Sequence, residues 1–171
     1  MPDASSEYTD FYLRNSEGAW PLHTLQVNQV SFSKEYRFQP YYREGLWLRD
    51  ESGQQQYYQW MPLKLDSLSD RANLDFGLSV TLGDLGEFLP DEIQRARDAG
   101  TLVTDPAVVR YRIYRSNNLE APMYGPITLQ AKTIARTVQG AQFDAKAPQI
   151  NATKTGMIYR TDLFPTLLGF L

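Results

Sequence analysis

The sequence predicts a mainly β fold, built on an antiparallel sheet with one short helix. Three observations predict it. Apolar side chains occupy every second position of 74–82, two aromatic runs flank a polar turn at Asp50–Gly53, and aromatic residues make up 13% of the chain, with 11 tyrosines. Strict alternation puts one row of side chains on each face of a strand, and tyrosine is enriched in strands.

The chain of 171 residues favours one domain with extensions. We predict an extended N-terminal arm over residues 1–24, because Gly18 and Pro21 break its periodicity. The β domain follows over residues 25–150. Residues 151–171 form an apolar C-terminal tail, which must be buried on its own domain or in a partner.

The first half of the β domain contains a strand, a broken aromatic run and a hairpin. The strand begins at Leu25, and its pattern indicates a bulge near 28–29. A proline interrupts the run 36–42, which is therefore a loop or an edge strand. Residues 45–61 predict a hairpin whose polar turn ends in a glycine able to take positive φ.

The second half contains the strand 74–82, a helix and two further strand regions. The helix spans about 85–99, with a proline in its first turn and a glycine just after its end. Alternation then predicts a strand over 108–115. A second hairpin spans 126–145 and turns at Gly140, with a shift of register along its first strand.

Composition argues against several classes of function. The net charge is -3 and the 17 basic residues are dispersed, so we expect no nucleic-acid partner. No apolar run reaches the roughly 18 residues that cross a bilayer, so we expect no membrane span. The polar, acidic N-terminus is unlike a signal peptide, and the absence of cysteine fits synthesis in a reducing cytoplasm.

The sequence predicts no catalytic, metal or cofactor site. His23, the single histidine, is interpreted as an incidental residue of a proline-bounded loop. The acidic pairs Asp50–Glu51 and Asp91–Glu92 fit a hairpin turn and a helix start. A glycosidase pair stays open as an alternative, because the separation of two carboxylates cannot be read from a sequence.

Side chains suited to contacts with partners lie mainly outside the central strands. The interface candidates are Tyr8, Phe11 and Tyr12 in the arm, Trp47 and Trp60 in the hairpin, Arg110 and Arg112 on one strand face, and Phe164, Leu168 and Phe170 in the tail. The arm packs either on its own domain or on a neighbouring subunit. The two arginines form either a solvated face or a charged surface that meets an acidic partner.

The order of elements resembles the tail-tip proteins of long-tailed bacteriophages. An apolar strand is followed by a short helix, a basic tyrosine-bearing strand, an apolar segment with a proline at 119–123, a strand pair and an aromatic tail with an Arg-x-Asp-x-Phe-Pro motif at 160–165. The chain is similar to the L-type tip protein of lambda-like phages and to related short prophage tail-assembly proteins, over roughly residues 25–165.

The resemblance implies a β-barrel or sandwich of the tail-tube or hub type. It implies a non-enzymatic virion component of the tail tip or baseplate hub, made in the host cytoplasm. Its partners would be the distal tail protein and the hub, central-fibre or receptor-binding protein, in a homo-oligomeric ring that is a trimer in preference to a hexamer. The iron–sulfur region of the lambda-type protein cannot be carried over, because this chain has no cysteine.

Two other functions are weighed against this one. The first is a carbohydrate-binding β-sandwich, in which Trp47, Trp60 and the hairpin tyrosines stack on sugar rings. The second is a hydrolase acting on cell-wall glycan through one of the acidic pairs. Neither is supported by a recognisable catalytic or sugar-binding motif.

Overall fold

The computed structural model describes residues 4–14, 18–67, 77–83, 88–137 and 140–147. The strands are β1 (Pro21–Asn28), β2 (Tyr36–Gln39), β3 (Leu46–Arg49), β4 (Gln55–Trp60), β5 (Leu63–Ser67), β6 (Gly77–Gly83), β7 (Ala107–Arg115), β8 (Tyr124–Thr137) and β9 (Gly140–Lys146). The helices are α1 (Ala4–Arg14), α2 (Phe88–Asp98) and α3 (Thr101–Thr104). The mainly β class is confirmed, with more helix than predicted.

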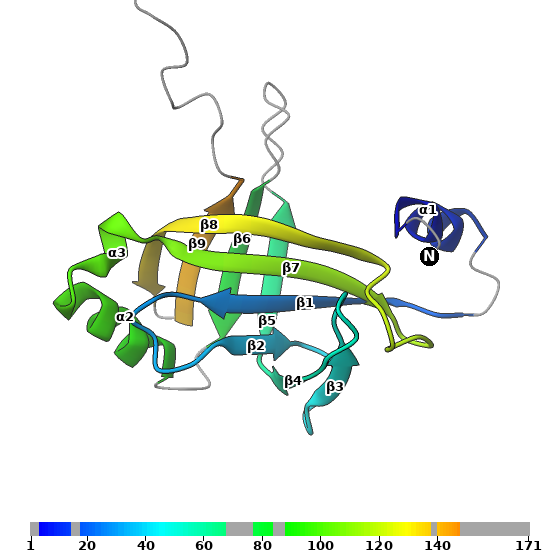
Figure 1. The fold of residues 1–171 in the computed structure, drawn as a ribbon, viewed down its shortest axis with the longest axis horizontal. Helices are drawn as coiled ribbons and strands as arrows, with labels where there is room; N and C mark the ends of the chain where they lie inside the picture. The colour runs from blue at the N-terminus through cyan, green and yellow to red at the C-terminus, as the bar shows by residue number, and fades with distance from the viewer. Residues whose placement is uncertain (1–3, 15–17, 68–76, 84–87, 138–139, 148–171) are drawn as a thin grey trace, which may run out of the picture.

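All the strands belong to one nine-stranded sheet, in the order β3-β4-β2-β1-β7-β8-β9-β6-β5. Neighbours are antiparallel except β2 and β4, which run parallel. The expectation of a purely antiparallel sheet was therefore wrong at this one pair. In Figure 1, β5, β6 and β9 cross behind β1 and β7, so the sheet folds over into two layers.

The sheet curls, so that β4 near one edge and β5 at the other edge are linked by only two residues of the chain. Met61 and Pro62 connect β4 to β5. The Met61 N–H donates to the carbonyl of Gln39 at 3.0 Å, and the Gly83 N–H donates to the carbonyl of Pro62 at 2.7 Å. A Cβ at position 83 would lie 2.9 Å from the Cβ of Pro62, so the closure needs a glycine there. Whether the curled sheet is of the barrel or the sandwich type stays a prediction.

Strands β1 and β7 form the centre of the sheet and are covered on both faces. On one face Leu25 lies opposite Tyr111 and Val27 opposite Val109, within the main core. On the other face a smaller cluster joins the strands to the β3–β4 hairpin; it consists of Leu22, Leu48, Tyr58 and Tyr114. Strand β1 ends at Asn28 without the predicted bulge, because the chain turns there instead.

Helix α2 closes one end of the curled sheet, at the left of Figure 1. The predicted helix about 85–99 corresponds to Phe88–Asp98, with Pro90 in its first turn as expected. Gly100 follows with φ +69°, a left-handed conformation that suits a residue at a helix end. Ala96 is fully buried, and Ile93 packs against the main core. The helix is therefore held by its apolar face, as its short length requires.

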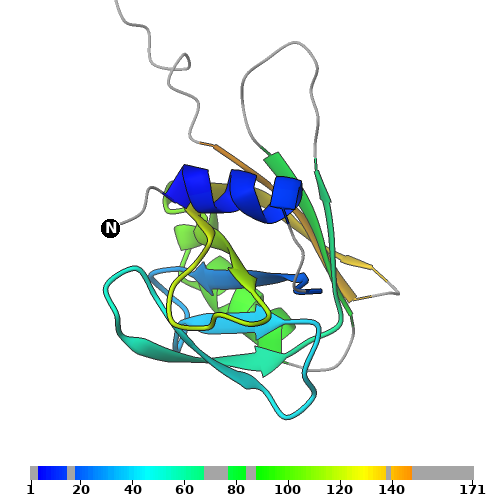
Figure 2. The same cartoon turned by 90° about the vertical axis from the view of Figure 1, so that its right-hand side faces the viewer.

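Helix α1 replaces much of the predicted extended arm. Residues 4–14 are helical and residues 21–24 already belong to β1, so both the conformation and the boundary of the arm were wrong. The breaking residues Gly18 and Pro21 lie after the helix, where they do not interrupt it. Phe11 is buried against the main core. Figures 1 and 2 show α1 at the end of β7 and β8, on the side away from α2.

The two predicted hairpins are confirmed. Asp50 accepts hydrogen bonds from the N–H groups of Ser52 and Gln54, both at 2.9 Å, and Gly53 has φ +79°. Strands β8 and β9 pair antiparallel, with a register shift between Ala131 and Thr133, as the broken alternation predicted.

The aromatic run 36–42 contains β2, which lies between β4 and β1 and is not an edge strand. Its proline follows the last strand residue, so the ladder is not interrupted. The predicted strand 74–82 is described only from Gly77 onward, where Leu78, Val80 and Leu82 are buried. The C-terminal tail 151–171 lies outside the described residues.

Candidate functional site

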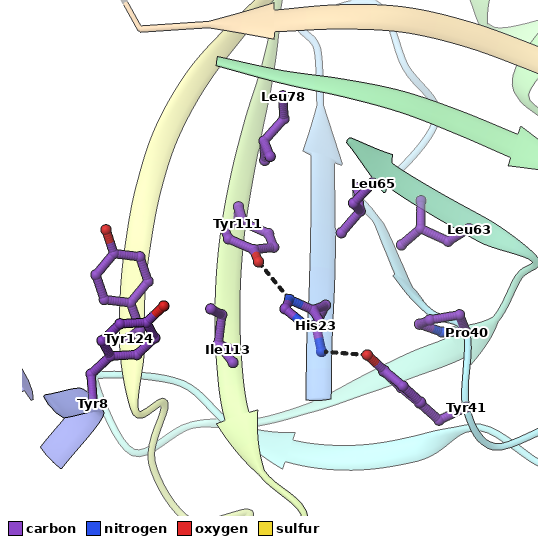
Figure 3. A pocket seen from close by; sticks show the side chains of 10 residues that line it. All are labelled: Tyr8, His23, Pro40, Tyr41, Leu63, Leu65, Leu78, Tyr111, Ile113 and Tyr124. Carbon is purple, nitrogen blue, oxygen red and sulfur yellow. Dashed lines mark hydrogen bonds between the residues drawn. The ribbon is translucent and has the colours of Figure 1, made fainter. Parts of the chain in front are cut away.

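A pocket of about 390 Å³ includes Tyr8 of α1 in its lining. Helix α1 lies at the end of the curled sheet opposite α2 (Figure 1). Five strands, the segment after β2 and helix α1 supply the lining of the pocket (Figure 3). The lining residues are Tyr8, His23, Pro40, Tyr41, Leu63, Leu65, Leu78, Tyr111, Ile113 and Tyr124. Four of these ten are tyrosines, and none carries a carboxylate, an ammonium or a guanidinium group.

The polar centre of the pocket is a contact between His23 and Tyr111. His23 Nδ1 lies 2.5 Å from the Tyr111 hydroxyl, and the two rings are nearly parallel, at an interplanar angle of 12°. His23 lies opposite Ile113 on β7, so regular antiparallel pairing places both side chains on the same face of the sheet. The Tyr41 hydroxyl accepts a hydrogen bond from the His23 backbone N–H at 3.2 Å (Figure 3).

Burial fixes the protonation state of this pair at neutral pH. It lowers the pKa of the His23 imidazole below 6.5, so the ring is neutral. It also raises the pKa of the Tyr111 hydroxyl, and the neighbouring tyrosines Tyr8 and Tyr41 raise it further. Tyr111 therefore keeps its proton. A neutral imidazole has one donor and one acceptor nitrogen. If Nδ1 accepts a hydrogen bond from Tyr111, Nε2 is a donor, and if Nδ1 donates, Nε2 is an acceptor.

Tyrosine rings border the pocket on the α1 side. The Tyr8 and Tyr124 ring centroids are 4.7 Å apart, and those of Tyr8 and Tyr12 are 4.8 Å apart. Tyr12 and Tyr41 remain 53% and 39% exposed. The rings give the pocket aromatic surfaces with polar tips, which suits contact with another ring.

The pocket can hold a group, but its described residues do not form a catalytic set. Among the described lining residues, no serine, cysteine or carboxylate accompanies the contacting pair His23 and Tyr111 as a nucleophile or orienting group. Over the described residues, no cluster of three His, Asp or Glu side chains could hold a metal ion. The described lining offers apolar contacts, aromatic rings, tyrosine hydroxyls and the His23 imidazole.

The two predicted interface arginines differ in their exposure. Arg110 and Arg112 share one face of β7, as predicted, but only Arg110 is exposed. Arg112 is 3% exposed and makes two hydrogen bonds of 2.9 Å to the Glu51 carboxylate from the hairpin turn. The Arg112 hydrogen bonds lower the pKa of Glu51. Arg112 is therefore a poor interface residue, because its charge is used inside the chain.

The predicted tryptophans also have different surroundings. Trp47 is 56% exposed, with its ring centroid 5.2 Å from that of Tyr57. Trp60 is half-buried, donates its Nε1–H to the carbonyl of Pro40 at 3.3 Å and lies under the Arg43 guanidinium. Of these two tryptophans, Trp47 is the one that offers its ring to a partner.

The acidic pairs have structural roles. Asp50 holds the hairpin turn and Glu51 pairs with Arg112. Glu92 is 4% exposed and accepts hydrogen bonds from the Ser33 N–H at 2.8 Å and the Tyr36 hydroxyl at 3.0 Å. Burial raises the pKa of Glu92, but these hydrogen bonds and the charge of Arg95 outweigh it, so the net shift is downward.

The remaining interface candidates divide between α1 and the tail. Tyr12 is exposed, Tyr8 is half-buried at the pocket, and Phe11 is buried with the Arg115 guanidinium 5.6 Å from its ring centroid. Phe164, Leu168 and Phe170 lie outside the described residues. No helix in the described ranges is long and apolar enough to span a bilayer.

Sequence reasoning missed the pocket because it placed His23 in a loop. Pro21 was interpreted as a boundary, whereas it is the first residue of β1, a position where proline is tolerated. Extending the alternation of Leu25 and Val27 backwards by one step would have put His23 on the core face. That pattern is the signal that could have placed His23 in the core, although it does not identify Tyr111 as its neighbour.

Comparison with models of known protein families gives no match, and comparison with curated proteins gives none either.

Proposed function

We propose that this chain is a non-enzymatic structural component of the tail tip or baseplate hub of a long-tailed bacteriophage. In that role it joins the distal end of the tail tube to the central-fibre or receptor-binding protein. The proposal starts from the order of elements along the chain. Its curled β-sheet with a helix packed at one end is compatible with the tube-type fold that the resemblance implies.

The observation that carries the proposal is the distribution of exposed large apolar side chains. Within the described residues they are Tyr12, Leu13, Trp20, Val30, Tyr41, Tyr42, Trp47 and Tyr57. Most lie on α1, on the segments that follow α1 and β2, and on the β3–β4 hairpin. Tyrosine and tryptophan are enriched at the centres of protein interfaces. Two elements that each present such rings suit a protein held between neighbours in a ring.

The ring should contain several copies of this chain, with three in preference to six. Each contact in such a ring must bury on the order of 1,000 Å² to be stable. Leu13 is 76% exposed and Trp47 is 56% exposed, and a neighbour would bury both. Arg110, which is exposed and lies 3.8 Å from the Glu35 carboxylate, adds a place where an acidic partner can bind.

The test is mass spectrometry of purified virions, with quantification of the copy number of this chain. We expect the chain to be present in a small multiple of three copies per particle. A Leu13→Ser, Trp47→Ala double variant should remain folded but be depleted from particles. A matched control, Lys64→Ala, changes an exposed side chain outside these elements and should be incorporated normally. Virions that lack the chain but assemble and infect normally would remove the proposal.

A carbohydrate-binding module is the second candidate function. The exposed Trp47–Tyr57 pair on the hairpin is the observation that favours it, since aromatic rings stack on sugars. The two rings are inclined at 55°, so a sugar would stack on Trp47 alone and not on a joint platform. Binding to a glycan array that Trp47→Ala abolishes would favour this module over the tail-tip role. Uniform indifference to glycans would exclude it.

A further inference from the structure

The inference drawn from the pocket opposite α2 does not depend on the proposed assembly role, although Tyr41 belongs both to its lining and to the exposed rings. We propose that the pocket binds an uncharged aromatic ring that carries one hydroxyl group. A volume of about 390 Å³ lies near the lower end of pockets that bind small ligands. It is large enough to accommodate one ring with a substituent.

The absence of charge among the described lining residues selects against ions. All ten lining residues have neutral side chains at pH 7, given the lowered pKa of His23 and the raised pKa of Tyr111. An ion that left water for this pocket would find no opposite charge there, and burial of an unpaired ion is costly. The ligand is therefore neutral.

The polar centre selects for a hydroxyl group. In the described part of the chain, His23 Nδ1 contacts Tyr111 and Nε2 has no hydrogen-bond partner. Depending on the tautomer, Nε2 is a donor or an acceptor. A hydroxyl group can satisfy both cases, because it donates one hydrogen bond and accepts others. A ligand with a single fixed role would match only one tautomer.

The walls select for an aromatic ring in preference to a sugar. Leu63, Leu65 and Leu78 form an apolar side, and the rings of Tyr8 and Tyr124 border the other (Figure 3). A sugar has hydroxyl groups around its whole rim, each of which would need a partner, and the leucine side of the pocket supplies none. A phenol has one polar atom and one apolar ring, so it can present the hydroxyl to His23 and the ring to the leucine side. The phenol can be a free small molecule or a tyrosine side chain of another polypeptide.

The test is titration of the full chain with p-cresol, followed by NMR chemical shifts and calorimetry. We expect saturable binding that perturbs the His23 imidazole resonances. Toluene lacks the hydroxyl group and should bind about tenfold more weakly, as expected for one lost hydrogen bond. 4-Hydroxybenzoate adds a carboxylate and should bind at least about tenfold more weakly, because the pocket offers that charge no partner.

Variants tie the binding to the pocket. Leu65→Phe fills the pocket and should weaken p-cresol binding by at least about tenfold, as a loss of most ring contacts requires. Leu63→Phe fills the same wall and serves if Leu65→Phe does not fold. His23→Phe removes the polar partner and should reduce the preference for p-cresol over toluene to near unity. Trp47→Ala lies outside the lining and should leave the affinity unchanged.

A blocked Gly-Tyr-Gly peptide distinguishes the two sources of the phenol. Binding of the peptide at least as tight as that of p-cresol assigns the pocket to a tyrosine side chain of a polypeptide. Binding of p-cresol alone assigns it to a free small molecule. The inference is overturned if p-cresol does not bind, or if Leu65→Phe and Leu63→Phe bind it as well as the wild type. Such a failure would leave the virion test unaffected, and the reverse also holds.

Discussion

The two ends of the curled sheet differ in how completely a helix covers their opening. At the α2 end, an amphipathic helix fills the opening, and its own Ala96 is fully buried. The buried carboxylate there, Glu92, accepts hydrogen bonds from the Ser33 N–H, the Tyr36 hydroxyl and Arg95. At the other end, α1 stands beside the opening and leaves a pocket in which His23 and Tyr111 mainly satisfy each other.

This difference indicates that the α2 end contributes to stability and that the pocket end is suited to recognition. A buried polar group stabilises a protein only when its partners are complete, and the α2 end meets that condition. The pocket end keeps a hollow and a polar nitrogen with spare capacity, both of which cost stability. Departures from complete packing of this kind are expected at functional sites.

The largest loss of stability is expected from a substitution at the α2 end. Glu92→Ala removes the acceptor of the Ser33 N–H and of the buried Tyr36 hydroxyl, and should lower the free energy of unfolding by about 2 kcal/mol. Urea denaturation measures it. The adjacent Asp91→Ala is the control, because that exposed side chain should change the same quantity by less than about 0.5 kcal/mol. Equal losses from the two variants would show that the cluster around Glu92 does not hold this end.

A smaller loss is expected at the pocket end. Tyr111→Phe removes the hydroxyl that contacts His23 and keeps the ring in the core, so the free energy of unfolding should fall by about 1 kcal/mol. Tyr42→Phe is the matched control, since its ring is 38% exposed and its loss should be negligible. A loss from Tyr111→Phe larger than that from Glu92→Ala would reverse the comparison between the two ends.

The two ends should also respond to different pH ranges. The folded-state pKa of His23 is lowered below its ordinary 6.5, so the unfolded chain takes up the proton first. The stability contributed by neutral His23 is therefore complete above pH 6.5 and is lost as the pH falls below it. The pKa of Glu92 is lowered below 4.5, so its contribution is lost only below that value.

Denaturation curves between pH 8 and pH 3 separate these ranges. His23→Phe should flatten the curve of stability against pH just below 6.5, and Glu92→Gln should flatten it below 4.5. Asp50 and Glu51 also have lowered pKa values, so part of the lower step will persist in Glu92→Gln. A wild-type protein equally stable at pH 7 and pH 5 would contradict the burial of a neutral His23.

The smallest loss of stability is expected on the β3–β4 hairpin. The losses at the two ends of the sheet can be compared with it. Trp47 is 56% exposed and contacts mainly Tyr57. Trp47→Ala should therefore change the free energy of unfolding by no more than about 0.5 kcal/mol, measured by urea denaturation. A larger loss would mean that Trp47 stabilises the fold itself, and would weaken its use as a probe of partner contacts.

Local signals predicted the local parts of the fold. The hairpin turn at Asp50–Gly53 is made by its own residues, so its sequence was sufficient. The helix Phe88–Asp98 was likewise marked by a first-turn proline and by the glycine after it. The register shift in β8 was visible as broken alternation.

Features that depend on distant segments could not be predicted. The strand pattern placed Arg110 and Arg112 on one face, but the burial of Arg112 depends on Glu51, which is 61 residues away in the chain. The pocket likewise combines residues from Tyr8 to Tyr124. Single-sequence alternation carries no information on which strands become neighbours, so it could not bring His23 to Tyr111.

The pairing of β1 has a consequence for synthesis on the ribosome. One edge of β1 pairs with β2, a few residues further on, where Leu25 meets Phe38. Its other edge pairs with β7, where Leu25 meets Tyr111. That second edge has no partner in a nascent chain until β7 has left the exit tunnel. Because open strand edges promote association between chains, the nascent protein passes through an interval in which it is prone to aggregate and suited to chaperone binding.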